Sequence, residues 1–68
     1  MAQVAHLPFV DGDSGDEGFA TVRVERQFVG LALSLRGDGD IEVFLDVKAL
    51  DSLIQALRTA QAEIGPSE

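Results

Sequence analysis

The sequence predicts an α+β domain in which a three-stranded antiparallel sheet is followed by one C-terminal amphipathic helix packed on one face of the sheet. Apolar and polar residues alternate with a period of two in three segments between residues 19 and 45. From residue 47 onward the period changes to about 3.6, which is typical of a helix. A turn sequence, Arg36-Gly37-Asp38-Gly39-Asp40, separates the second and third segments. The expected order of elements is therefore β-β-β-α.

The three predicted strands cover residues 19–26, 29–35 and 41–45. Their alternation places a uniformly apolar set on one face: Ala20, Val22, Val24, Val29, Leu31, Leu33, Leu35, Ile41, Val43 and Leu45. The opposite face is mixed and carries Phe19, Thr21, Arg23, Ala32, Ser34, Glu42 and Phe44. Because a sheet buries its apolar face against another element, the first face is expected to meet the helix.

The predicted helix runs from about residue 47 to residue 64. Its apolar stripe consists of Val47, Leu50, Leu53, Ile54, Leu57, Ala60 and Ile64. Asp46 is placed to cap the N-terminus, and Gly65-Pro66 ends the helix, because glycine adopts the left-handed C-terminal position and proline cannot continue the helix.

The chain divides by composition into three parts. Residues 1–18 form an apolar N-terminal arm and an acidic Gly-rich loop, DGDSGDEG at 11–18, residues 19–64 form the β-β-β-α domain, and residues 65–68 form a C-terminal tail. The loop has little to bury and high backbone entropy to lose, so we expect it to be mobile. The arm is a candidate for an edge strand or for a contact with a partner.

Length and charge limit the function classes. A chain of 68 residues without cysteine has a thin core and no disulfide to support it, so a partner subunit is the expected supplement. A net charge of −7 disfavours direct binding of nucleic acid. No segment approaches the roughly 18 to 20 apolar residues of a membrane helix. We therefore expect a soluble, cytoplasmic protein.

The sequence lacks the residues that a calcium loop or a catalytic histidine site requires. Read as a calcium loop that starts at Asp11, the sequence has Gly15, Asp16 and Val22 where an acid or amide, a glycine and a glutamate are needed. His6 is the only histidine, and no residue nearby in the sequence completes a site with it. We therefore expect no enzyme activity, no cofactor and no metal.

The tripeptide Asp51-Ser52-Leu53 resembles the phosphopantetheine attachment sequence of acyl carrier proteins, which are also small and acidic. That family is a helical bundle with the serine at the start of a helix. Here Ser52 lies in the second turn of the only predicted helix, after strands. We therefore interpret Ser52 as a polar residue of the outer helix face.

Two functional hypotheses remain, and a third shares the surface of the first. The leading one is a non-enzymatic protein-interaction module that self-associates as a dimer through Phe19, Ala32 and Phe44 on the mixed face. The alternative is an acidic inhibitor or adaptor, of the kind that phages and mobile elements encode, which occupies a basic site on a nucleic-acid-handling protein. Its candidate residues are Asp11, Asp13, Asp16, Glu17, Asp38 and Asp40. The third is an accessory subunit of a larger complex that uses the same mixed face.

Overall fold

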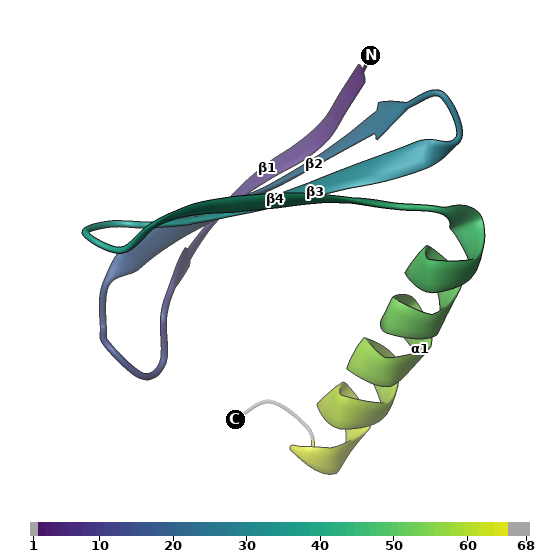
Figure 1. The fold of residues 1–68 in the computed structure, drawn as a ribbon. Coiled ribbons are helices and arrows are strands. Elements are labelled where there is room, and N and C mark those ends of the chain that lie inside the picture. Colours follow the sequence, from purple (N-terminus) through teal and green to yellow (C-terminus); the bar gives the residue numbers. More distant parts are fainter. Residues whose placement is uncertain (1, 66–68) are drawn as a thin grey trace.

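The computed structural model describes residues 2–65 and contains one sheet and one helix in this range (Figure 1). The strands are β1 (Ala2–Val10), β2 (Glu17–Glu25), β3 (Phe28–Leu35) and β4 (Gly39–Leu45), and helix α1 spans Val47–Glu63. The strands form an antiparallel meander in the order β1-β2-β3-β4. The α+β class, the antiparallel sheet and the C-terminal helix are therefore confirmed.

The prediction of three strands was wrong, because the N-terminal arm forms a fourth strand. β1 pairs with β2 along its length, from Ala2 opposite Val24 to Val10 opposite Glu17. A bulge between Gln3 and Ala5 interrupts the alternation of β1, and the strand also contains Pro8. Both features are tolerated because β1 is an edge strand and pairs on one side only.

The register of the sheet confirms the two faces predicted from alternation. One row of paired neighbours is uniformly apolar and consists of Ala5, Val22, Leu31 and Val43. The next row lies on the opposite face and consists of Gln3, Arg23, Gly30 and Phe44. Successive side chains of a strand point to opposite faces, so this alternation of rows extends along the sheet.

The two turns that connect β2, β3 and β4 differ in their chemistry. β3 and β4 are joined by Arg36-Gly37-Asp38, in which Gly37 has a φ of 82° and the Asp38 N–H donates to the Leu35 carbonyl at 3.0 Å. This is the turn that the sequence predicted. β2 and β3 are joined by Arg26 and Gln27, and Arg26 has a φ of 59°. A non-glycine residue in this region costs about 1–2 kcal/mol. Because neither Arg26 nor Gln27 is a typical turn residue, the sequence did not mark this turn.

Both ends of α1 are capped as predicted. The Asp46 carboxylate accepts a hydrogen bond from the Ala49 N–H at 2.9 Å. At the other end Gly65 has a φ of 75° and its N–H donates to the Ala62 carbonyl at 3.1 Å. The predicted range of the helix is confirmed to within one residue. Of the predicted tail at 65–68, only Gly65 lies within the described residues.

The helix lies on the apolar side of the sheet but diverges from it (Figure 1). Within residues 2–65 the backbone of the helix comes close to β3 and β4 but not to β1 or β2. No residue of α1 is buried, and no hydrophobic side chain among residues 2–65 is buried. The predicted packing of the helix on the sheet is therefore only partial. Asp46 alone connects β4 to a capped helix, and so short a link leaves little freedom to change the direction of the helix.

Candidate interaction surfaces

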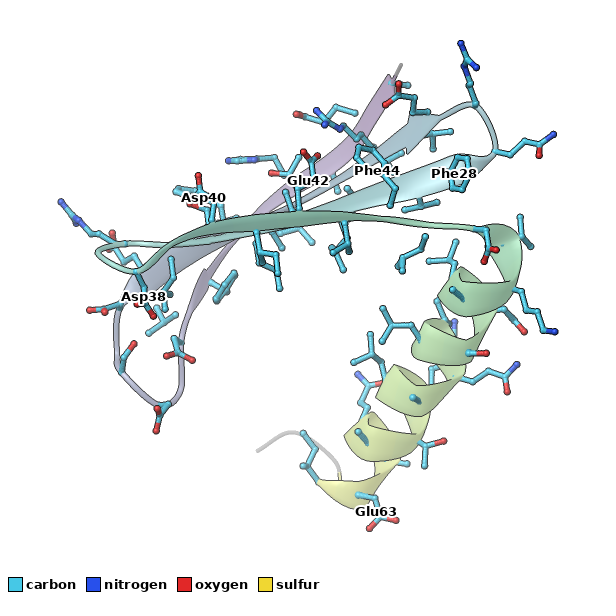
Figure 2. The ribbon with its side chains drawn as sticks, viewed as in Figure 1. Phe28, Asp38, Asp40, Glu42, Phe44 and Glu63 are labelled. Carbon is cyan, nitrogen blue, oxygen red and sulfur yellow. The ribbon has the colours of Figure 1, made fainter. Side chains whose placement is uncertain are left out.

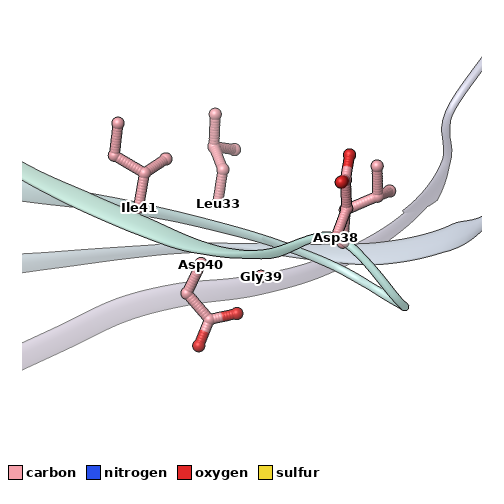
Figure 3. Close-up of a pocket in the computed structure, with 6 residues that line it drawn as sticks. Leu33, Asp38, Gly39, Asp40 and Ile41 are labelled. Atoms are coloured by element: carbon pink, nitrogen blue, oxygen red, sulfur yellow. The ribbon is translucent and has the colours of Figure 1, made fainter.

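No hydrophobic residue on the apolar face of the sheet is buried, and each is either exposed or half-buried. We define this face by the hydrophobic residues that point to the same side of the sheet as Val22 and Leu31. They are Ala5, Leu7, Phe9, Ala20, Val22, Val24, Val29, Leu31, Leu33, Leu35, Ile41, Val43 and Leu45. None of them is charged. Ile41 is 61% exposed and Leu7 is 54% exposed. Figure 3 shows Leu33 and Ile41 rising together from this side of the sheet, while Asp40 points to the other side.

The helix stripe is also open. It consists of Val47, Leu50, Leu53, Ile54, Leu57, Ala60 and Ile64. Leu50, near the start of the helix, is half-buried, whereas Leu57 is 59% exposed and Ile64 is 81% exposed. Exposure of the stripe therefore rises from Leu53, at 36%, toward the C-terminal end of the helix. The chain thus carries two large apolar surfaces that its own fold does not bring together, which is typical of an interaction site.

The polar-aromatic face is the opposite side of the sheet and contains the three residues predicted as a protein contact. Phe19 on β2, Ala32 on β3 and Phe44 on β4 form a diagonal across it. Figure 2 shows Asp40, Glu42 and Phe44 on the side of the sheet away from the helix. The structure therefore brings the three predicted residues onto one face, and their role stays a prediction.

Several side chains of the polar-aromatic face are already engaged with one another. The Phe44 ring lies over Gly30, and the Arg23 guanidinium lies 5.7 Å from the ring centroid. Arg23 Nη2 also pairs with Glu42 Oε2 at 2.5 Å, with both side chains about one-third exposed. A pair with this exposure contributes at most about 1 kcal/mol. Its main effect is to hold Arg23 across the centre of the face.

His6 has the partner that the sequence did not reveal. Its Nδ1 lies 2.8 Å from Thr21 Oγ1, and its ring stacks on Phe19 with 4.7 Å between centroids. The pair sits on the exposed polar-aromatic face, where stacking and the hydrogen bond fix the ring. Within residues 2–65 no three metal-ligating side chains come together around His6 or elsewhere.

The six predicted acidic residues gather at one end of the molecule, which we call the acidic end. The loop between β1 and β2 carries Asp11, Asp13 and Asp16, and Glu17 begins β2. The turn between β3 and β4 carries Asp38, and Asp40 lies near the start of β4. Antiparallel connectivity places these two connections at the same end of the sheet, as Figure 1 shows. Arg36 Nη1 lies 3.5 Å from Glu17 Oε1 and is the basic group that bridges the two segments.

The acidic loop is more ordered than its composition indicated. The Asp11 carboxylate accepts hydrogen bonds from the Ser14 hydroxyl at 2.7 Å and from the Ser14 N–H at 3.0 Å. The Ser14 hydroxyl oxygen in turn accepts from the Asp16 N–H at 3.1 Å. The Ser14 hydroxyl, followed by the Ser14 N–H, holds the pKa of Asp11 below its usual value of 3.8.

We expect the order of this loop to depend on the charge of Asp11. Because the pKa of Asp11 is lowered by folding, its contribution is complete above pH 4 or so and is lost as the pH falls through the lowered pKa. Asp11→Ala should therefore make the Ser14 amide exchange several-fold faster at neutral pH, as measured by NMR hydrogen exchange. The matched control is Asp13→Ala, since no side-chain hydrogen bond of Asp13 is found in the described loop. Equal exchange in both variants would contradict this account.

No helix in residues 2–65 is long and apolar enough to cross a membrane. Comparison with known proteins found no matching family model, no matching curated protein and no matching solved structure.

Proposed function

We propose that this chain is a non-enzymatic protein-interaction module that works as a homo-oligomer, most simply a two-fold dimer. The observation that carries the proposal is that no hydrophobic side chain among residues 2–65 is buried. Hydrophobic residues make up 46% of the chain. Burial of apolar surface is the main favourable contribution to folding, so a second protein surface is needed to supply it.

The accessible surface of the chain exceeds that of a compact monomer by about the area that a dimer interface buries. The chain has a mass of 7.2 kDa and an accessible surface of 5613 Å², whereas a compact monomer of this mass exposes roughly 4,100 Å². Its radius of gyration is 13.4 Å, against roughly 11 Å for a compact chain of this length. The excess surface is more than roughly 1,000 Å², which is what each partner of an obligate dimer buries.

The solution mass of the full chain tests this proposal. We expect static light scattering to give twice the chain mass of 7.2 kDa over a wide concentration range. The melting temperature should rise with protein concentration, because unfolding of a dimer releases two chains. A monomeric mass at every concentration, together with cooperative unfolding at a fixed temperature, would overturn the proposal.

A second candidate function is binding of a basic partner protein through the acidic end. The observation that favours it is the meeting of two acidic segments from distant parts of the chain, with Arg36 as the basic group between them. Attraction of this kind steers association and weakens with salt. The probe is an arginine-rich peptide, whose affinity should fall when Asp13 and Asp38 are both changed to Asn. Unchanged affinity, or no dependence on salt, would exclude the acidic end as the site.

A further inference from the structure

We propose that the two copies meet through the apolar face and the helix stripe, with the helix of each copy lying across the apolar face of the other. This inference rests on the proposed self-association and adds the surface and the arrangement. In such a dimer the polar-aromatic face and the acidic end remain on the outside. The leading sequence hypothesis placed the interface on the polar-aromatic face instead, so the two arrangements make opposite predictions.

The surfaces of one chain complement each other but meet only where the helix contacts β3 and β4. The backbone of the helix comes close only to β3 and β4, and Leu7 on the distant edge strand β1 is 54% exposed. The link of one residue, Asp46, and the hydrogen bond from Ala49 to its carboxylate set the helix on its diverging path. A two-fold axis places the helix stripe of each copy on the apolar face of the other. The same contact therefore forms twice and covers both surfaces in both copies.

The edges of the sheet are poor places for a second copy. β1 is interrupted by the bulge near Gln3 and contains Pro8, both of which discourage the addition of a strand. β4 is the other edge and carries Asp40 and Glu42. Two-fold pairing of β4 with its copy would bring like charges together, which is destabilising. Association through a face is therefore favoured over extension of the sheet.

The distribution of charge favours the apolar face. Each chain carries a net charge of −7, so two copies repel unless their acids stay apart. The apolar face carries no charged residue, and Lys48, Asp51 and Arg58 lie opposite the helix stripe. Contact through the polar-aromatic face would instead remove the Arg23–Glu42 pair from water, and the cost of desolvating two charges can exceed their attraction.

Two matched substitutions on β4 separate the two faces. Ile41 is 61% exposed on the apolar face, and Phe44 is 47% exposed on the polar-aromatic face. Ile41→Asp places a charge in the proposed interface and should raise the dimer dissociation constant more than about 100-fold. Phe44→Asp should keep the dimeric mass. Light scattering and sedimentation equilibrium measure both variants and the unaltered chain.

A direct measurement on the unaltered chain tests the arrangement even where a variant fails to fold. Chains labelled with ¹³C at isoleucine methyl groups are mixed and refolded with unlabelled chains, and filtered NOE spectra then report contacts between copies. The chain has three isoleucines, of which Ile54 and Ile64 lie on the helix stripe and Ile41 lies on the apolar face. We expect contacts from the Ile54 methyl group to side chains of β1 and β2 in the other copy, including Leu7 and Val22.

The outcomes separate the self-association from the arrangement of the two copies. Monomeric unaltered protein overturns both the self-association and the arrangement. A dimer that Phe44→Asp dissociates and Ile41→Asp preserves leaves the self-association intact and overturns the arrangement. A dimer in which Ile54 contacts only its own chain, or only the partner's helix, also overturns the arrangement. Loss of the dimer in Ile41→Asp alone, with contacts between copies from Ile54 to β1 and β2, supports it.

Discussion

Gly18→Ala is expected to destabilise the sheet by about 1–3 kcal/mol or more, although it adds a single methyl group. Gly18 is buried near the start of β2. A Cβ atom at this position would lie 2.6 Å from the carbonyl oxygen of Ser34 and 2.8 Å from the ring of Phe9. The first contact is with backbone, so no rotation of a side chain relieves it. The strand itself must move, and urea denaturation should report the loss of stability.

Gly12→Ala is the matched control for this prediction. Gly12 lies in the loop between β1 and β2, and nothing lies within 4 Å of the position that its Cβ would occupy. An alanine there removes freedom from the unfolded chain, so stability should stay the same or rise by a few tenths of a kcal/mol. If Gly18→Ala were as stable as Gly12→Ala, the close approach of β2, β3 and the Phe9 ring would be wrong.

The sequence predicted the local features of this fold because short-range chemistry determines them. Alternation assigns the faces of β2, β3 and β4, since neighbouring side chains of a strand point in opposite directions. Asp46 and Gly65 mark the ends of the helix, because a carboxylate and a left-handed glycine satisfy its terminal backbone groups. The strands were predicted one or two residues short at their N-terminal ends, where Glu17 and Gly39 carry no apolar signal, and the first was predicted one residue too long, to Arg26.

Features that depend on the third dimension were missed. For the N-terminal arm the sequence left an edge strand as one of two possibilities, because the bulge after Gln3 and the proline at position 8 break the alternation, and its pairing with β2 decides for the strand. The direction of the helix depends on the geometry at Asp46, whereas the stripe indicates only that one side is apolar. The partner of His6 was likewise hidden, because Thr21 is fifteen residues away and becomes a neighbour only through pairing.

For the candidate surfaces, too, the sequence predicted which residues share a face but not how distant segments come together. Alternation correctly placed Phe19, Ala32 and Phe44 on one face, and composition identified the acids of the acidic end. The convergence of Asp11 and Asp38 depends on how the hairpins connect. The openness of the apolar face could not be predicted, because hydropathy shows that a surface needs cover and leaves open whether the same chain provides it.

Leu57→Ala is expected to cost about 2–5 kcal/mol, the range for a leucine truncated in a packed core. In the single chain Leu57 is 59% exposed, so its truncation there removes little buried surface and should cost well under that amount. In the proposed dimer the same side chain lies against the apolar face of the other copy. Urea denaturation at two protein concentrations measures the difference.

Thr59→Ala, on the opposite side of the same helix, separates loss of the contact from a change in helix propensity. Alanine favours helix over both leucine and threonine, so propensity alone would leave Leu57→Ala unchanged or slightly stabilised and would stabilise Thr59→Ala. A large loss confined to Leu57→Ala, in a chain whose urea midpoint rises with protein concentration, requires that Leu57 be buried between chains. Equal and small effects would mean that the helix stripe stays in water, and the dimer would then have to bury its apolar surface without the helix.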